Sequence, residues 1–270
     1  MSLRRLAPGM GSVEGSRVFV TGASSGIGAA LALELARRGA HVALLARTRY
    51  RLDEVAASCR ARGVEAHVVV ADLGDAAEAR AGAESAWDAL GHLDVVVNNA
   101  GMPLRRHVVR LGDDDVQDTM ALNFFGAVTV TLTLLPRMVE RGSGRIVNVG
   151  SVAGRVAAPR EAAYVASKFA LAGWSDTLAV DLAGTGIAVH HVCPGVIDTP
   201  LWDVPGQEPP AYRGRRTPAP KVAAAIVDAM ERGRYETVVP RVLAPALGLR
   251  ALMGETYLKL TARFDRRQGR

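Results

Sequence analysis

Tyr164 and Lys168 have the clearest capacity for chemistry in this 270-residue sequence, which holds five tyrosines and three lysines. They stand four positions apart in the segment "YVASK", and residues with that spacing lie on one face of a helix. A free phenol titrates near pH ~10, and a neighbouring ammonium favours the phenolate and lowers that pKa. The pair therefore predicts proton transfer at Tyr164; the alternative is an ordinary pair on a helix surface.

A glycine-rich turn, "TGASSGIG", follows an apolar run near the start of the chain and precedes a helical pattern. Glycines allow the turn and the close approach of a pyrophosphate, and the helix N-terminus offers unpaired N–H groups. We predict a dinucleotide-phosphate site there rather than a tight turn without a ligand. Its predicted residues are Gly22, Ser24, Ser25, Gly26, Ile27 and Gly28.

The elements that must position these residues are short apolar runs alternating with helical patterns. Continuous apolar strands indicate a parallel sheet covered on both faces, and right-handed crossovers make it open and doubly wound. The fold class is therefore α/β, with a mostly parallel, seven-stranded, Rossmann-type sheet. Strands are expected at 16–22, 41–47, 65–73, 93–101, 144–151, 187–195 and 235–240. Helices are expected at 26–39, 50–62, up to about 90, 113–141, 161–183 and 220–232.

One domain is expected over residues 16–240, after a flexible lead at 1–15. Residues 198–220 are rich in Pro, Gly and Arg and follow the end of a strand, so they are expected to form a mobile substrate lid. Residues 241–270 are expected to be a helical tail. The tail has an apolar stripe of Leu249, Leu252, Met253, Tyr257, Leu260 and Phe264. This stripe favours packing on this chain or on a neighbouring subunit over contact with a membrane or a lipid substrate.

The net charge of +6 comes from arginines spread along the chain, so nucleic-acid binding is not expected and a phosphate-rich cofactor is the favoured acidic partner. Cys59 and Cys193 are far apart and suggest neither a metal site nor a disulfide, which suits a reducing cytoplasm. The N-terminus lacks the apolar region of a secretory signal. No uninterrupted apolar run of about eighteen residues predicts a spanning helix.

Several motifs occur together in one order: the glycine turn, Asp72-Leu73, "NNAG" at 98–101, Asn123, Ser151, the Tyr164/Lys168 pair and Pro194-Gly195. In this set the sequence resembles the short-chain dehydrogenase/reductase family, from about residue 16 to 240. The resemblance implies an oxidoreductase that transfers hydride between a nicotinamide cofactor and a carbonyl or secondary alcohol. It also implies a homodimer or homotetramer, often formed through the helices that hold Asn123 and Tyr164.

The resemblance implies four catalytic residues. Tyr164 would be the general acid in reduction and the base in oxidation, and Lys168 would orient the nicotinamide ribose and tune the phenol. Ser151 would hydrogen-bond the substrate oxygen, and Asn123 would distort its helix and hold a water in a proton relay. The alternatives are a helix cap for Ser151, a surface position for Asn123 and simple packing for Tyr164.

The resemblance also implies further cofactor contacts. Asp72, beside Leu73, would accept from the adenine amino group, although a turn or cap Asp is the common alternative. The carboxyl end of the fourth strand would lie beside the ribose, and a later turn would meet the nicotinamide carboxamide. These two segments contribute Asn99, Ala100 and Gly101, and Pro194, Gly195, Val196 and Thr199.

The second predicted strand ends "LLART", without the acid that usually holds a ribose 2′-hydroxyl. Arg47 stands where a guanidinium could pair with a 2′-phosphate, and Ser24 could add a hydrogen bond. NADP(H) is therefore favoured over NAD(H), with a solvent-facing Arg47 as the alternative.

The substrate is expected to be a small or medium molecule with an apolar body. Trp202 and Tyr212 could form one wall, residues 102–106 and 153–156 the other, while Arg213, Arg215 and Arg216 could bind an acidic group or be solvated. The prediction is an NADP(H)-dependent carbonyl reductase or alcohol dehydrogenase. The alternatives are an epimerase or dehydratase on the same fold, or a regulatory or scaffold protein that binds NADP without turnover.

Overall fold

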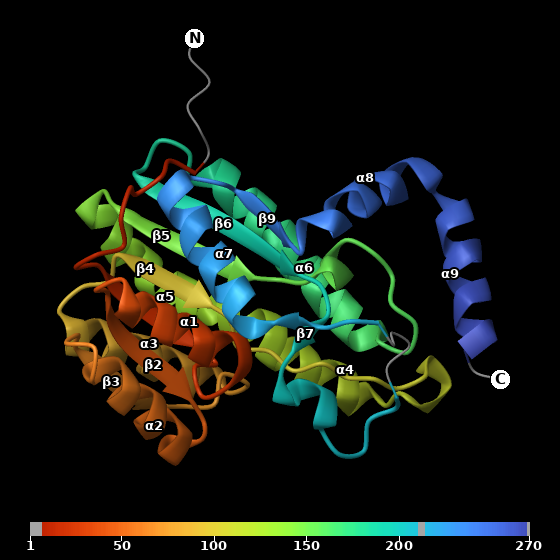
Figure 1. Ribbon diagram of the computed structural model, residues 1–270, viewed down its shortest axis with the longest axis horizontal. Helices are drawn as coiled ribbons and strands as arrows, with labels where there is room; N and C mark the ends of the chain where they lie inside the picture. The colour runs from red at the N-terminus through yellow and green to blue at the C-terminus, as the bar shows by residue number, and fades with distance from the viewer. Residues whose placement is uncertain (1–6, 210–213, 269–270) are drawn as a thin grey trace, which may run out of the picture.

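Seven parallel strands form the central sheet, and Figure 1 shows them between two layers of helices. The computed structural model describes residues 7–209 and 214–268. Every neighbouring pair in the sheet is parallel, which confirms the predicted doubly wound, Rossmann-type domain. In order across the sheet the strands are β3 (Ala66–Val70), β2 (His41–Ala46), β1 (Arg17–Thr21), β4 (Val95–Asn98), β5 (Gly144–Val149), β6 (Ile187–Pro194) and β9 (Glu236–Val239).

The helices divide between the two faces of the sheet. One face carries α1 (Gly26–Arg37), α2 (Arg49–Arg60) and α7 (Ala219–Arg232); the other carries α3 (Ala76–Leu90), α4 (Asp113–Met120), α5 (Gly126–Arg141) and α6 (Ala162–Asp181). Successive residues of β1 enter different cores: Val18 and Val20 pack under the first layer, and Phe19 packs under the second. Both sides of the strand are buried, so the strand reads as a continuous apolar run.

The chain reverses its direction of travel across the sheet between β1 and β4. From β1 it proceeds through β2 and β3 to one edge, and from β4 it proceeds through β5 and β6 towards the other. In an open parallel sheet, ligands bind at the carboxyl ends of the strands beside such a switch point. The segments that follow β1 and β4 hold the glycine turn and "NNAG", so the topology brings these two motifs together.

The helix predicted over 113–141 is continuous in space but is not uniform. A π-helical turn, Ala121–Phe125, separates α4 from α5, and Asn123 lies within it. By length and composition alone this helix could cross a membrane, although the sequence predicted no such helix. Here it packs against α3 and α6 as a covering layer of the sheet.

The regions predicted as lid and tail leave the sheet at its carboxyl edge. Two-residue strands, β7 (Ile197–Asp198) and β8 (Thr217–Pro218), pair at the two ends of the lid segment. The tail pattern predicted as one helix is two, α8 (Ala244–Met253) and α9 (Glu255–Gln268), because Gly254 between them has a φ of 49°. Figure 1 shows them as an arm that projects from the body.

The predicted tail stripe is only partly covered. Met253 and Tyr257 are half-buried, whereas Leu252 and Leu260 are exposed. The side chains of Leu249 and Phe264 lie outside the described part of the chain, as do residues Tyr212 and Arg213 of the lid.

Candidate active site

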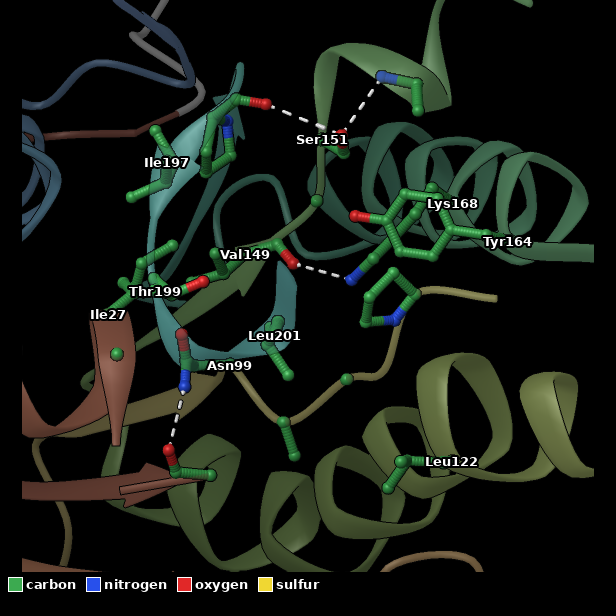
Figure 2. Close-up of a pocket in the computed structure, with 18 of the residues that line it drawn as sticks. Ile27, Asn99, Leu122, Val149, Ser151, Tyr164, Lys168, Ile197, Thr199 and Leu201 are labelled. Atoms are coloured by element: carbon green, nitrogen blue, oxygen red, sulfur yellow. Dashed lines mark hydrogen bonds between the residues drawn. The ribbon is translucent and has the colours of Figure 1, made fainter. Parts of the chain in front are cut away.

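A cavity of about 600 Å³ runs along the carboxyl edge of the sheet. It holds Ser151, Tyr164 and Lys168 together with the glycine turn, which come from different elements of the fold (Figure 2). Of the predicted cofactor residues, the cavity wall contains Gly22, Ser24, Ser25, Gly26, Ile27, Arg47, Asp72, Leu73, Asn99, Ala100, Gly101, Tyr164, Lys168, Pro194, Gly195, Val196 and Thr199. The structure therefore brings all the predicted cofactor residues except Gly28 to one cavity.

The glycine turn is fixed by the neighbouring strand. The Asn99 amide donates to the carbonyls of Thr21 and Gly22, at 2.9 and 3.3 Å, and the Thr21 hydroxyl accepts from the backbone N–H groups of Asn99 and Ala100. Gly22 has a φ of 66°, and a Cβ there would lie 2.8 Å from the Ala100 Cα. The close approach of the two segments therefore depends on glycine at this position.

Gly28 does not belong to the wall of the cavity as the described residues define it. A Cβ at this position would lie 2.2 Å from the Gly22 carbonyl oxygen. The contact between Gly28 and the cofactor therefore stays a prediction, and the structure shows that a glycine at this position lets α1 pack closely against the turn.

The start of α1 can receive an anion. Ser25 precedes the helix with extended backbone and makes no side-chain capping bond, and Gly26 follows with a φ of 56°. A Cβ on Gly26 would lie 3.1 Å from the Thr199 methyl carbon, so a larger residue would fill this end of the cavity. An uncapped N-terminus and a cradle kept open by glycine fit a dinucleotide pyrophosphate.

Arg47 and Asp72 lie opposite each other at the far end of the same cavity. The Arg47 Nη1 and Asp72 Oδ2 atoms are 3.6 Å apart, and the side chains are 65% and 41% exposed. Thr48 and Arg51 also line this end and were missed from the sequence. The signal was available, since Arg51 follows Arg47 by four residues, in the first turn of α2.

Tyr164 and Lys168 face the same space, as their spacing predicted. Figure 2 shows the phenol ring beside the lysine side chain; the Lys168 Nζ is 5.8 Å from the ring centroid and donates to the Val149 carbonyl at 3.1 Å. The Ser151 Oγ accepts from the Ala153 N–H at 3.0 Å and donates to the Pro194 carbonyl at 3.4 Å. Ser151 therefore both caps a short 3₁₀ turn, Val152–Gly154, and presents its hydroxyl to the cavity.

The pKa of Tyr164 differs from the sequence-based expectation. Burial raises it to about 12, although part of the side chain faces the cavity, and the hydrogen-bonding contribution of Ser151 only partly opposes this. Burial also lowers the pKa of Lys168 to about 8. The expected lowering by the ammonium is wrong for the chain without cofactor, because burial disfavours the charged forms of both groups.

Asn123 lies behind the cavity wall rather than in it. Its amide group donates to the Met102 carbonyl at 2.9 Å and to the Ser167 Oγ at 3.0 Å, and its oxygen accepts from the Met102 N–H at 2.7 Å. Ser167 in turn donates to the Tyr164 carbonyl at 2.7 Å. The distorted turn predicted for Asn123 is present, and its side chain ties this turn to the helix of Tyr164.

The part of the cavity on the far side of Ser151 and Tyr164 from the glycine turn, which we call the substrate half, is mostly apolar. Two charged side chains lie on its wall. Arg105 is only 3% exposed, and burial raises the pKa of Glu161 to about 7, partly opposed by the charge of Arg105. From the predicted walls the structure places Pro103, Arg105, Ala153, Val156 and Trp202 at the cavity. Residues not predicted there are Leu122, Val152, Ala157, Ala158, Pro159, Glu161, Leu201 and Thr261.

The predicted arginine cluster of the lid does not line the cavity as far as the structure describes it. Arg216 stacks on Trp202, 4.9 Å from its ring centroid, and lies 3.6 Å from Asp198. Arg215 is exposed. Near Trp202 and Glu161, the arginine that lines the cavity is instead Arg105, which comes from the segment after β4.

Arg105 holds the lid segment against the body. Its side chain donates to the Glu208 and Trp202 carbonyls, at 2.9 and 3.0 Å. The Gln207 amide donates to the Pro103 carbonyl at 2.8 Å, and its oxygen accepts from the Arg105 N–H at 3.3 Å. The described part of the predicted lid is thus tied by hydrogen bonds to the segment after β4.

His191, Cys193 and Glu236 form a cluster whose possible ligand atoms lie within 4.8 Å of one another. Two features oppose a metal there. Arg155 already pairs with the Glu236 carboxylate at 2.8 Å, and burial raises the pKa of Cys193 to about 12, so the thiol keeps its proton. The sequence had assigned no metal site, and the charge of Arg155 argues against one here.

Residues 16–208 match the family described as short chain dehydrogenase. The chain is 38% identical over 192 residues to a fatty acyl-CoA reductase of Acinetobacter baylyi, covering 70% of this chain and 65% of that protein. It is 33% identical over 231 residues to the ketoacyl reductase HetN of Nostoc, covering 85% of this chain and 80% of that protein.

Solved structures agree with this assignment. A short chain dehydrogenase/reductase from Burkholderia phymatum in complex with NAD superposes with a TM-score of 0.84 at 25% identity, over 92% of this chain and 96% of that one. A short-chain dehydrogenase from Sphingobium yanoikuyae in complex with NADPH gives 0.79 at 30% identity, over 91% and 95%. The chain belongs to the short-chain dehydrogenase/reductase family and is an NAD(P)-dependent oxidoreductase that acts on small molecules.

Proposed function

We propose that this chain is an NADP(H)-dependent reductase of carbonyl compounds, or dehydrogenase of the corresponding secondary alcohols, with Tyr164 as its general acid and base. The observation that supports the proposal is that Ser151, Tyr164 and Lys168 line the same cavity as the glycine turn. When bound, the reduced nicotinamide supplies a hydride to the carbonyl carbon. The glycine turn, Arg47 and Asp72 would hold the rest of the cofactor.

The proton that the carbonyl oxygen needs would come from residues of the protein. The Ser151 hydroxyl would donate a hydrogen bond to the carbonyl oxygen, and Tyr164 would give that oxygen its proton as negative charge develops on it. A phenol with a pKa of about 12 is protonated at neutral pH, yet it is far more acidic than an aliphatic alcohol. The reverse reaction needs the phenolate, which the Lys168 ammonium would favour. Alcohol oxidation is therefore expected to accelerate with pH more steeply than carbonyl reduction.

The test is consumption of NADPH with a panel of ketones, aldehydes, steroids and acyl carriers. Oxidation of one NADPH per alcohol formed supports the proposal. Conversion without net NADPH consumption would identify an epimerase or dehydratase. Tight NADPH binding without turnover of any compound, with Tyr164→Phe equal to wild type in every assay, would identify a regulatory protein.

The preference for NADP(H) rests on two guanidinium groups, Arg47 and Arg51, at the end of the cavity beyond Asp72. A 2′-phosphate is recognised best by such groups, and β2 ends without a competing acid. Arg47→Ala is expected to raise the KM for NADPH by at least about tenfold and to change that for NADH by less than about twofold. Faster turnover with NADH in the wild-type protein would contradict the preference.

We also propose a homodimer or homotetramer. Phe125, Leu132 and Val139 lie seven residues apart along one face of the π turn and α5, and all three are exposed. Such a stripe is typical of a helix that packs on a partner. Light scattering of the wild-type chain and of Leu132→Arg tests this: the variant is expected to be smaller, and a monomeric wild type would contradict it.

A further inference from the structure

The C-terminal arm, α8 and α9, contributes to the cavity of the active site. Thr261 of α9 lines the same cavity as Ser151 and Tyr164, although no motif in the tail indicated it. Figure 1 shows α9 on the same side of the body as the segment that leads from β5 into α6. The arm therefore has a position from which it can contact a substrate.

Two contacts fix the inner face of the arm. The Tyr257 hydroxyl donates to the Ala157 carbonyl at 3.1 Å, and the Arg250 guanidinium lies 5.1 Å from the centre of the Phe169 ring. Ala157 belongs to the cavity wall, and Phe169 follows Lys168 on α6. Both anchors are therefore adjacent to the catalytic segment rather than to a remote part of the surface.

The wall between the catalytic residues and the arm is apolar. Beyond Ser151 it is formed by Val152, Val156, Ala157, Ala158, Pro159 and, across the cavity, Leu201. The Thr261 hydroxyl donates to the Tyr257 carbonyl at 3.0 Å within α9, so its hydrogen-bonding demand is met inside the helix. A ligand in this part of the cavity would be held by burial of apolar surface rather than by hydrogen bonds.

We propose that the arm is the outer wall of the substrate site, and that the site takes carbonyl compounds or alcohols with an extended aliphatic chain. The proposal rests on the proposed function. The reacting oxygen of the substrate would lie at Ser151 and Tyr164. Its aliphatic chain would extend outward between the 156–159 segment and α9. Arg105 and Glu161 also line the cavity, so a polar substituent on the substrate would be directed to them and away from the arm.

The test is the dependence of kcat/KM on chain length in a series of straight-chain aldehydes and 2-ketones. Each buried methylene is expected to raise kcat/KM by about fourfold until the chain reaches α9. In Thr261→Phe the added ring fills the outer end, and the ratio of long-chain to short-chain kcat/KM is expected to fall at least tenfold. The matched control is Thr256→Phe, the same substitution at an exposed position of the same helix, which is expected to keep the wild-type ratio.

A second variant tests the anchor. Tyr257→Phe removes the hydroxyl that holds Ala157 and keeps the ring, so the long-chain KM is expected to rise several-fold more than the short-chain KM. An equal change for all chain lengths in both variants, or no change in either, would overturn the proposal. A smaller oligomer for Tyr257→Phe with unchanged chain-length dependence would also overturn it, by making the arm an assembly element.

Binding of a long-chain tertiary alcohol, measured by calorimetry, separates this proposal from the proposed function, because such an alcohol cannot be oxidised. In one outcome, wild type reduces no carbonyl yet binds this alcohol, and binding is at least tenfold weaker in Thr261→Phe. That result would contradict the proposed reaction and support the arm as the outer wall of the site. If carbonyls are reduced but the alcohol binds equally to both proteins, the outer wall fails and the reaction stands.

Discussion

The two halves of the cavity are built in different ways. The cofactor half is made by turns at the carboxyl ends of adjacent strands, and hydrogen bonds such as those of Asn99 fix it to the sheet. The substrate half is assembled from segments far apart in the chain: the loop after β4, the start of α6, the lid and α9. Its walls carry a few charged groups among apolar side chains.

This difference shows what each half can tolerate. In the cofactor half a Cβ at Gly22 would collide with the Ala100 backbone, and behind its wall a Cβ at Gly28 would collide with the Gly22 carbonyl. In the substrate half the contacts are made by side chains and by hydrogen bonds across loops, which can shift. We therefore expect substitutions to abolish function in the first half and to change selectivity in the second.

The largest effect is expected at Tyr164, which belongs to both halves. Tyr164→Phe removes the proton donor but keeps the ring, so kcat is expected to fall by about 10²–10⁴ while the Kd for NADPH stays close to wild type. Stopped-flow and steady-state rates, together with fluorescence titration of NADPH, measure the two quantities. A variant that loses cofactor binding and turnover together would show that Tyr164 supports the cofactor half alone.

The second prediction concerns the stability of the central sheet, which supports both halves of the cavity. His190 of β6 is fully buried, its Nδ1 lies 2.7 Å from the Arg234 carbonyl, and burial lowers its pKa to about 4. The unfolded chain takes up this proton near pH ~6.5, so it binds more protons than the folded chain between the two values. The contribution of His190 to stability is therefore expected to fall on acidification through that window, by on the order of 3 kcal/mol. Glu161, whose pKa burial raises to about 7, contributes with the opposite sign over the same window, so the effect of His190 is read from the difference between wild type and variant.

Urea unfolding at a series of pH values measures this loss. His190→Gln keeps an N–H donor and is expected to lose less stability than wild type on acidification from about pH 6.5 to 4.5, whereas the exposed His107→Gln is expected to follow the wild-type pH dependence. Carboxylates such as Glu236, whose pKa the His191 and Arg155 side chains lower to about 2, weaken the fold only below 4.5. An unchanged slope in His190→Gln would contradict the prediction.

The next effect contrasts two glycines. Gly28→Ala forces a methyl group against the Gly22 carbonyl and is expected to lower the free energy of unfolding by about 1–3 kcal/mol and to weaken NADPH binding. Gly173 lies within α6, and a methyl group there would meet no atom within 4 Å, so Gly173→Ala is expected to be neutral or stabilising. Equal effects at both positions, seen by thermal unfolding, would contradict the claim that the packing of α1 on the turn depends on glycine at position 28.

The smallest effect is expected in the lid. Gln207→Ala removes the bonds to Pro103 and Arg105 but leaves those of the Arg105 side chain to the lid. Only part of the ~0.5–1.5 kcal/mol per lost bond is therefore expected to appear in the substrate KM, as a rise of less than about tenfold. The Kd for NADPH is expected to stay the same. A large loss of cofactor affinity would mean that the lid and the cofactor half are not separate.

The sequence predicted the cofactor half better than the substrate half for a physical reason. The phosphate site needs glycine at particular backbone positions and a strand–turn–helix context, so Gly22 and Gly26 carry a local signal. Ser151, Tyr164 and Lys168 follow from spacing and resemblance.

The remainder depends on tertiary structure. Thr261 reaches the cavity only because α9 turns back at Gly254, and no local pattern shows this. The role of Gly28 and the raised pKa of Tyr164 arise from packing and burial, which spacing does not reveal. Glu161 was visible in the sequence, one turn before Tyr164, but its burial beside Arg105 was not.

The most direct test of the account is to follow deuterium from NADPH labelled at the transferable position into an alcohol product. Mass spectrometry of the wild-type reaction is expected to show one deuterium on the carbinol carbon for each NADPH oxidised, and Tyr164→Phe is expected to show the same label at a far lower rate. Product formed without the label, or label transferred equally fast by Tyr164→Phe, would contradict the proposed chemistry.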